Sequence, residues 1–151
     1  MKVLVATEKP FSKVAVDGIR RIVEEAGHTF AALEKYTDAS QLLEAVADAD
    51  ALIVRSDKVT REVIAAAPNL KIVVRAGAGF DNLDLPACTE RGIVAMNTPG
   101  QNSNAVAELA IGMMIYISRN QFTPGTGSEL KGKTLGIQAY GNVGRLVASH
   151  A

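Results

Sequence analysis

The sequence predicts an α/β fold: a doubly wound parallel sheet of flavodoxin-like order, followed by the start of a Rossmann unit. Short aliphatic runs recur along the first two thirds of the chain, and they are continuous rather than alternating, as in strands covered on both faces. Segments with one apolar helical face separate them, an alternation typical of parallel sheets with right-handed crossovers. We expect strands at 3–6, 51–54, 72–74 and 93–96, with a weaker one at 29–33.

The helical segments have recognisable ends. Residues 14–26 stop before Gly27, a plausible C-cap, and residues 38–49 start at Asp38, a good N-cap residue. A third helix opens at Thr60 and closes before Pro68. Residues 102–120 predict a longer helix whose only charge between 105 and 117 is Glu108. A helix that is apolar nearly all round is expected to be buried between domains or between subunits.

A second unit is predicted after residue 100. Residues 135–137 are expected to begin a new strand, and a helix starts at the glycine-rich turn that follows. We therefore place a boundary near residue 100. Residues 1–100 are expected to form a complete five-stranded domain, and residues 101–151 a crossover helix and the first strand-turn-helix of a second domain.

Composition excludes several classes of function. The 151 residues carry 16 basic and 16 acidic side chains, and a surface for nucleic acid or an anionic membrane would need a basic excess. Cys88 is the one cysteine, so no internal disulfide is possible and a reducing, cytoplasmic setting is the simplest interpretation. The longest apolar stretch, 109–117, is far shorter than the roughly 20 residues that span a bilayer. We assign no metal site.

Polar residues and glycines follow three of the expected strands, where open parallel sheets bind their ligands. Arg55 and Ser56 follow the third strand, and the segments 75–82 and 97–102 follow the fourth and fifth. Gly77 and Gly79 could form an anion-binding nest of backbone N–H groups, or only an ordinary turn. The arginines Arg55 and Arg75 could each hold a phosphate or a carboxylate, or only a surface ion pair. Two further residues, Asp81 and Asn102, could simply cap helices.

A second candidate site lies at the turn 139–144. Gly141 would allow close approach of a pyrophosphate, and Gly144 would let helix and strand pack closely. The N–H groups of Asn142 and Val143, at the helix N-terminus, would meet the phosphates. Ala139 stands where this dinucleotide fingerprint has its first glycine, and it costs the tight turn its most permissive residue.

These segments together resemble the D-isomer-specific 2-hydroxyacid dehydrogenases, and among them the phosphoglycerate dehydrogenase branch. The similarity covers the chain from end to end and is carried by Ile53-Val54-Arg55-Ser56, Arg75-Ala76-Gly77-Ala78-Gly79-Phe80-Asp81-Asn82-Leu83-Asp84, Met96-Asn97-Thr98-Pro99 with Asn102-Ser103, Ala107-Glu108-Leu109 and Glu129-Leu130-Lys131-Gly132-Lys133-Thr134-Leu135-Gly136. The presence of both Arg55 and Arg75 favours the phosphoglycerate branch over branches that handle uncharged side chains.

The resemblance implies that residues 1–100 are a flavodoxin-like substrate-binding domain and that residues 101–151 hold the crossover helix and the truncated start of an NAD-binding Rossmann domain. It also implies NAD-dependent oxidation of 3-phosphoglycerate to 3-phosphohydroxypyruvate, at the head of serine biosynthesis. By carry-over, the substrate-binding residues are Arg55, Ser56, Arg75, Ala76, Gly77 and Asn102. The Gly77 region would bind the substrate carboxylate through backbone N–H groups, and Arg55, Ser56 and Asn102 would hold the phosphate. The cofactor-binding residues are Ala78, Val106, Gly141, Asn142, Val143 and Gly144, the first two on the nicotinamide side.

The resemblance also implies that no catalytic residue lies in this chain. The family's catalytic arginine, glutamate and histidine fall beyond Ala151, as does the acidic residue that anchors the cofactor ribose, which leaves the choice between NAD and NADP open. We expect the 151 residues alone to be inactive, to bind NAD weakly or not at all, and to form a homo-oligomer through the 102–120 helix. The alternatives are a dehydrogenase for another D-2-hydroxy acid and a non-catalytic module that binds a small acid.

Overall fold

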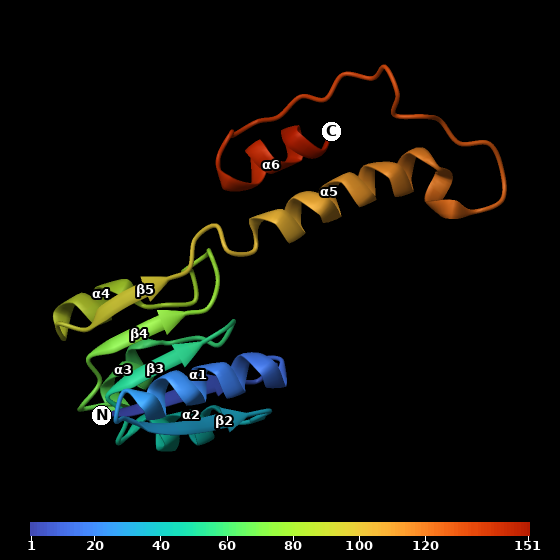
Figure 1. Ribbon diagram of the computed structural model, residues 1–151. Coiled ribbons are helices and arrows are strands. Elements are labelled where there is room, and N and C mark those ends of the chain that lie inside the picture. The colour runs from blue at the N-terminus through green and yellow to red at the C-terminus, as the bar shows by residue number, and fades with distance from the viewer. The chain divides into compact units, whose positions relative to one another are not determined.

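The computed structural model describes all residues, 1–151, and the chain forms two units, Met1–Thr98 and Pro99–Ala151. The first unit is a five-stranded sheet in the order β2-β1-β3-β4-β5, with every neighbouring pair parallel (Figure 1). The strands are β1 Lys2–Thr7, β2 Thr29–Glu34, β3 Ala51–Val54, β4 Ile72–Arg75 and β5 Val94–Asn97. The predicted flavodoxin-like order is confirmed.

Four helices cover this sheet. Helix α1, Lys13–Glu25, lies on one face, and α2, Ala39–Val46, α3, Arg61–Ala66, and α4, Leu85–Glu90, pack side by side on the other (Figure 1). Asp38 caps α2, and its capping box is completed by Gln41, whose side chain accepts from the Asp38 N–H. Helix α4 was not among the predicted elements, and its N-cap is Asp84, which accepts from the Ala87 N–H.

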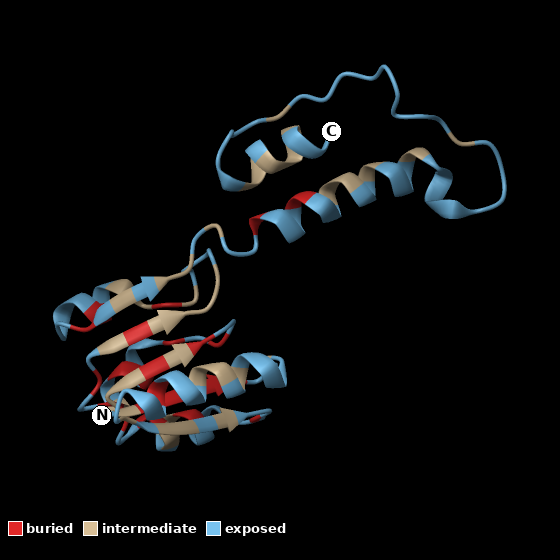
Figure 2. Cartoon of the chain, viewed as in Figure 1, coloured by how far each residue is buried: buried red, intermediate tan, exposed pale blue.

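The core lies between the sheet and the α2–α3–α4 layer, where the buried positions of the strands and helices coincide (Figure 2). Leu52, Val54 and Val73 from the strands and Val46 and Ile64 from the helices are almost fully buried. Each such side chain contributes about 1.5–3 kcal/mol of burial free energy. This layer fixes where the strands end, and therefore where the loops of the candidate site begin.

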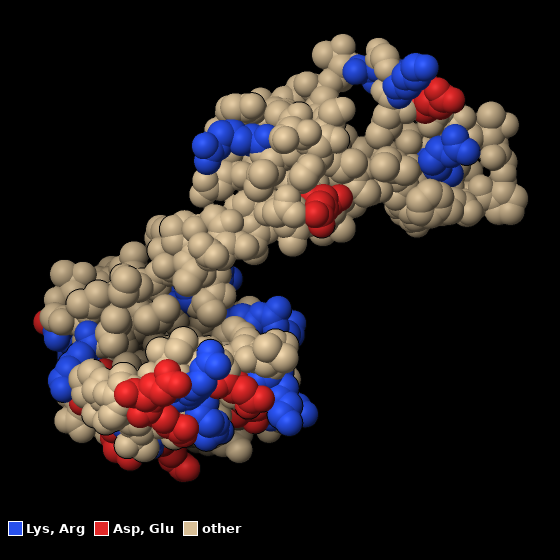
Figure 3. All heavy atoms as spheres, in the orientation of Figure 1, with Lys and Arg blue, Asp and Glu red and all other residues tan.

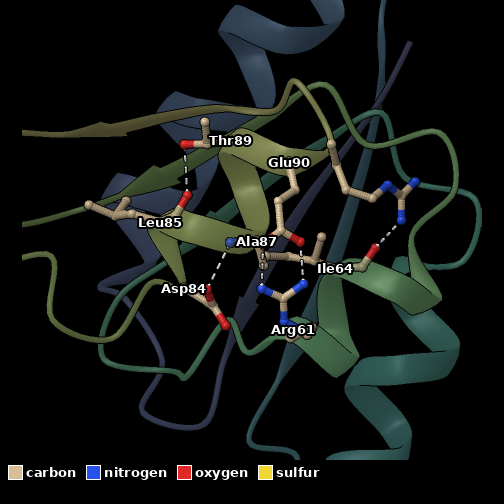
Figure 4. Close-up of polar contacts among 8 residues, drawn as sticks. Arg61, Ile64, Asp84, Leu85, Ala87, Thr89 and Glu90 are labelled. Carbon is tan, nitrogen blue, oxygen red and sulfur yellow. Dashed lines mark hydrogen bonds and ion pairs between the residues drawn. The ribbon is translucent and has the colours of Figure 1, made fainter.

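Polar contacts join α3 to α4 at the surface of this layer (Figure 4). The Arg61 guanidinium forms a two-pronged ion pair with the Glu90 carboxylate, and the pKa of Glu90 is lowered by that hydrogen bond. The Thr89 hydroxyl donates to the Leu85 carbonyl, and Arg91 Nη1 donates to the Ile64 carbonyl at 2.8 Å. These contacts hold two short helices that have little stability of their own.

The second unit is helical. It contains α5, Ser103–Ser118, a 3₁₀ turn η1, Asn120–Phe122, and α6, Asn142–His150, which packs on α5. The expected strand at 135–137 is not formed, so that prediction was wrong for this chain. A strand needs a hydrogen-bonded neighbour, and no other strand occurs in this unit. No helix in the structure combines the length and apolar character needed to cross a membrane.

Candidate substrate and cofactor sites

The loops that follow β3, β4 and β5 begin side by side. In the sheet register Val54 lies opposite Arg75, and Arg75 lies opposite Asn97, so the last residues of the three strands are neighbours. Arg55 and Ser56, the turn 76–79 and Thr98 therefore start from one short stretch of sheet edge. The sequence placed its candidate substrate residues of the first unit here, and the structure brings Arg55, Ser56, Arg75, Ala76 and Gly77 to this edge.

The two arginines form no ion pair, so the surface ion pair that the sequence left open is absent from the structure. Arg75 Nε donates a 3.0 Å hydrogen bond to the Arg55 carbonyl, which places the two residues against each other. The Arg75 guanidinium also lies against the α-carbon of Gly77, where any Cβ would overlap it. A side chain at Gly77 would therefore make the flexible end of Arg75 shift, and neither Gly77 nor Gly79 has a positive φ.

The N–H groups of the turn 76–79 divide into two pairs. Ala76 N–H donates to the Val54 carbonyl at 2.8 Å, and Gly77 N–H donates to the Arg75 carbonyl at 2.9 Å. The N–H groups of Ala78 and Gly79 have no acceptor in the protein. The donors that this turn offers to an anion are therefore those of Ala78 and Gly79, one step further along than the sequence placed them.

Segment 97–98 holds the carbonyls of the same turn. The Thr98 N–H donates to the Gly77 carbonyl at 2.9 Å, and Asn97 Nδ2 donates to the Ala78 carbonyl at 2.7 Å. Because a trans peptide carries its C=O and N–H on opposite sides, these bonds direct the next N–H groups away from residues 97–98. Sequence reasoning gave Asn97 no role of its own and placed it only in the segment 97–102 that follows the fifth strand.

The remaining residues that the sequence analysis singled out, whether for substrate, cofactor or helix capping, differ in their surroundings. Ser56 is exposed, and its hydroxyl makes no hydrogen bond within the protein. Asn102 belongs to the second unit and stands at the N-cap position of α5 without a side-chain capping bond. Asp81 caps no helix, because α4 begins four residues later behind Asp84. Val106 is an exposed residue of α5.

A cavity of the first unit lies at the carboxyl ends of β1, β2 and β3. It measures about 570 Å³ and shares only Ser56 with the residues assigned to substrate. Its wall contains a buried polar pair: the Tyr36 hydroxyl donates to Asp57 Oδ1 at 2.8 Å, and the Glu8 N–H donates to the same oxygen at 2.7 Å. Sequence reasoning gave Asp57 no role of its own, although its place directly after β3 is a signal that could have found it.

The second candidate site, the turn 139–144, has the shape of a phosphate-binding turn. Ala139 has a φ of 72°, the left-handed conformation that glycine adopts most easily. A Cβ on Gly144 would overlap the Ala139 carbonyl oxygen, so only glycine allows this close packing. Gly141 precedes α6 with open space beside it, and the first turn of α6 has no side-chain cap. Free N–H groups at Asn142 and Val143 fit a cofactor phosphate.

Arg145 supports this turn from within α6. Its Nη2 donates to Asn142 Oδ1 at 2.8 Å, and its Nε donates to the Gly141 carbonyl at 3.3 Å. Gly100, with a φ of 86°, lies close to the Asn142 side chain, and a cavity of about 310 Å³ is lined by Gly100, Ser103, Asn142, Arg145 and Leu146. The start of α5 and the start of α6 therefore meet at one hollow.

Comparison with known proteins decides the family. The profile described as "D-isomer specific 2-hydroxyacid dehydrogenase, catalytic domain" matches residues 9–150. The chain belongs to this family.

Similar dehydrogenases extend well beyond the matched region. D-3-phosphoglycerate dehydrogenase of Methanocaldococcus jannaschii is 42% identical over 145 residues, which cover 87% of this chain and 27% of that protein. Hydroxypyruvate reductase of Thermotoga maritima is 41% identical over 131 residues, which cover 78% of this chain and 43% of that protein. The chain therefore spans between about a quarter and a half of the length of these relatives.

Solved structures give the same fold. The NAD⁺-bound 3-phosphoglycerate dehydrogenase of Entamoeba histolytica superposes with a TM-score of 0.95 and 55% identity, covering 99% of this chain and 50% of that one. NAD-dependent formate dehydrogenase of Staphylococcus aureus, in complex with NAD, superposes with a TM-score of 0.82 and 30% identity, covering 99% and 53%.

The two histidines of this 2-hydroxyacid dehydrogenase chain lie in different units. His28 follows α1, one residue before β2, and so stands at the opposite edge of the sheet from the loops after β3, β4 and β5. It is therefore not placed to exchange a proton with a ligand held at Arg75 and the turn 76–79. His150 lies at the end of α6, and its Nε2 is 2.9 Å from Asn104 Oδ1.

Proposed function

We propose that this chain supplies the substrate-binding half of an NAD-dependent dehydrogenase that oxidises 3-phosphoglycerate to 3-phosphohydroxypyruvate, a step of serine biosynthesis. The observation that carries the proposal is the edge where Arg55 and Arg75, both without an ion-pair partner, lie beside two free backbone N–H groups. A substrate with a carboxylate at one end and a phosphate at the other needs two such anion sites. The phosphoglycerate dehydrogenases among the relatives support this substrate.

In this proposal the N–H groups near Gly77 hold the carboxylate, and Arg55 and Ser56 hold the phosphate. Arg75 lies between these groups, because its guanidinium contacts both Gly77 and the Arg55 carbonyl. A bidentate guanidinium suits either anion. NAD, when bound, accepts the hydride from the substrate; Ala78 and Val106 would line its nicotinamide side, and Gly141, Asn142, Val143 and Gly144 would meet its phosphates.

We propose further that the 151 residues alone turn over no substrate. Proton removal from a hydroxyl needs a general base within hydrogen-bond reach. His28 stands at the opposite edge of the sheet, and the Nε2 of His150 is already paired with Asn104 Oδ1. The turn 139–144 also lacks a strand beside it, so its N–H groups are poorly fixed and NAD binding is weak or absent. In its complete form the enzyme is a homo-oligomer that uses the 102–120 helix.

A second candidate substrate is hydroxypyruvate or another small 2-oxo acid, which a relative favours: the similar Thermotoga protein is a hydroxypyruvate reductase. The two arginines argue for the phosphorylated substrate, since an unphosphorylated acid needs only one anion site. The protein purified in its native form, with its intact mass measured, distinguishes these cases. NADH formation with 3-phosphoglycerate at a kcat/KM at least tenfold above that with D-glycerate supports the proposal. Equal values, or a preference for D-glycerate, contradict it.

A further inference from the structure

We infer that Asn97 is a positioning residue of the substrate site, which acts through the Ala78 carbonyl to aim the Gly79 N–H at the substrate carboxylate. The inference rests on the proposed function for the identity of the anion, and on the geometry of the first unit for everything else.

The first step is the state of the two peptide groups. The peptide between Gly77 and Ala78 has its carbonyl held by the Thr98 N–H at 2.9 Å, and the peptide between Ala78 and Gly79 has its carbonyl held by Asn97 Nδ2 at 2.7 Å. Both carbonyls therefore point toward the segment 97–98. In a trans peptide the N–H points the opposite way, and the structure contains no cis peptide.

The second step is the availability of the donors. The preceding N–H groups, of Ala76 and Gly77, are already bonded to the Val54 and Arg75 carbonyls, so they cannot serve an anion without breaking a bond. The N–H groups of Ala78 and Gly79 have no protein acceptor and belong to the two oriented peptides. The two N–H groups that are free to bind an anion are thus the same two whose orientation is held from residues 97–98.

The third step is the difference between the two anchors. The Ala78 N–H is oriented by a backbone donor, which no side-chain change removes. The Gly79 N–H is oriented by one side chain, that of Asn97, which is the last residue of β5 and lies opposite Arg75 in the register. The strand therefore fixes the Cα of Asn97, while its amide alone determines the orientation of the Ala78–Gly79 peptide. Glycine at position 79 makes that peptide easy to turn once the amide is lost.

The test uses the 151-residue chain labelled with ¹⁵N, titrated with D-glycerate and separately with 3-phosphoglycerate. We expect the amide signals of Ala78 and Gly79 to move downfield with both ligands, because both carry the carboxylate. Asn97→Leu keeps the side-chain size and removes the donor. It should abolish the shift of Gly79, leave that of Ala78, and weaken the affinity for both ligands about tenfold, as the loss of one hydrogen bond to a charged group would.

Asn82→Ala is the matched control. The Asn82 amide also holds a loop carbonyl, that of Asp57 at 2.8 Å, but it makes no hydrogen bond to the turn 76–79. This variant should lose comparable thermal stability and keep the Gly79 shift, which separates positioning from general loosening of the loops. If Asn97→Leu fails to fold, the native chain still decides the first step, since amides of Ala78 and Gly79 that ignore both ligands overturn the inference.

The outcomes separate this inference from the proposed function. Gly79 shifts that depend on Asn97, in a protein whose native form does not oxidise 3-phosphoglycerate, would support the inference and contradict the function. Oxidation of 3-phosphoglycerate by a protein in which Asn97→Leu leaves the Gly79 shift and both affinities unchanged would do the reverse.

Discussion

The hydroxyl of Tyr36 donates a 2.8 Å hydrogen bond to Oδ1 of Asp57, and both side chains are buried. The bond links the end of β2 to the loop after β3 across β1, which lies between them. The Asp57 carboxylate also accepts from the Glu8 N–H, and the main-chain carbonyl of Asp57 accepts from the Asn82 side chain, so Asp57 ties three other segments together. A buried carboxylate is tolerated only when it is hydrogen-bonded in this way.

Tyr36→Phe should lower the free energy of unfolding by about 2 kcal/mol, because a buried hydrogen bond to a charged acceptor is lost. The same variant should change the alkaline limit of stability. Burial, followed by the hydrogen bond to Asp57, raises the pKa of the Tyr36 phenol well above its ordinary value of 10.0. The contribution of the Tyr36 phenol to stability should therefore be fully present below pH about 10. Above that pH it should decline, because the phenol ionises in the unfolded chain while the folded protein keeps it neutral.

Urea midpoints of native protein and Tyr36→Phe at pH 8, 10 and 11 test this dependence. The difference between the two proteins should shrink as the pH rises. Both proteins are best compared with Cys88→Ala in place. Burial also raises the pKa of the Cys88 thiol, so the thiol would add a separate loss of stability at alkaline pH. A difference that stays constant across the series would show that Tyr36 does not ionise in the unfolded state over this range, contrary to the argument.

Asp50 should contribute to the loss of stability at acid pH. Its Oδ2 accepts from the Lys2 N–H at 2.8 Å and its Oδ1 from Lys71 Nζ at 2.9 Å, and the Lys2 N–H lowers the pKa of Asp50 most. This stabilisation is present above the unfolded pKa of about 3.9 and is lost as the pH falls through the lower folded value. Asp50→Asn should flatten the loss of stability in urea melts between pH 5 and 2. Asp17→Asn, on the exposed side of α1, should not.

Arg55 should discriminate between phosphorylated and unphosphorylated ligands, whereas Arg75 should serve both. In the 151-residue chain, Arg55→Ala should weaken 3-phosphoglycerate by roughly 1.5–3 kcal/mol, the value of a charge-assisted hydrogen bond, and leave D-glycerate nearly unchanged. Arg75→Ala should weaken both, since its guanidinium also contacts Gly77. Binding is measured by NMR titration, with Arg21→Ala on α1 as the control. Equal losses for both ligands in Arg55→Ala would exclude a phosphate role for this residue.

Ala139 and Gly144 should have opposite effects on the turn before α6. Ala139→Gly should stabilise the turn by about 1 kcal/mol, because a non-glycine residue at a φ of 72° is strained. Gly144→Ala should destabilise α6 by more than that, since its Cβ would overlap the Ala139 carbonyl oxygen. Hydrogen exchange of the α6 amides reports both changes. Gly136→Ala, where nothing lies nearby, is the control, and a response there equal to that of Gly144→Ala would undercut the steric explanation.

The sheet was predictable because each of its strands carries a local signal. The aliphatic runs of β1, β3 and β4 and the caps Asp38 and Thr60 determine elements within a few residues of themselves. Helix α4 was not predicted because it has only six residues, too few to show the apolar spacing of a helix. The strand at 135–137 failed for the opposite reason: the local pattern is that of a strand, but pairing depends on a neighbour elsewhere in the chain.

The candidate site was predictable in composition and not in detail. Which residues follow the strands can be read from the sequence, and so Arg55, Arg75 and Gly77 were found. The sequence does not show which N–H groups of the turn 76–79 are free. Those of Ala76 and Gly77 are taken by the Val54 and Arg75 carbonyls, and the orientation of the other two depends on donors at Asn97 and Thr98, which lie about 20 residues away in sequence. The Tyr36–Asp57 pair likewise joins residues 21 apart in sequence, and no local pattern marks it.

Helix α5 should make the chain associate with itself. One side of it is covered within the second unit, where Ala107 is buried and Ile111 and Met114 are partly so. The opposite side carries Val106, Leu109, Met113 and Ile117 at helical spacing, and Leu109 and Ile117 are 63% and 66% exposed. In the view of Figure 3, charged side chains gather on the first unit and are sparse on the second. A contiguous apolar stripe of this kind marks an interaction surface.

A second copy of α5 offers the same stripe, and a two-fold interface lets each copy cover the other. We therefore expect a dimer or larger assembly at low micromolar concentration, measured by light scattering. Leu109→Lys with Met113→Lys should give a monomer with unchanged helix content, because both side chains already face solvent in the single chain. Val14→Lys is the matched control, since Val14 is exposed on α1 of the first unit. A native chain that remains monomeric, or a dimer that persists in the double variant, would show that α5 is not the association surface.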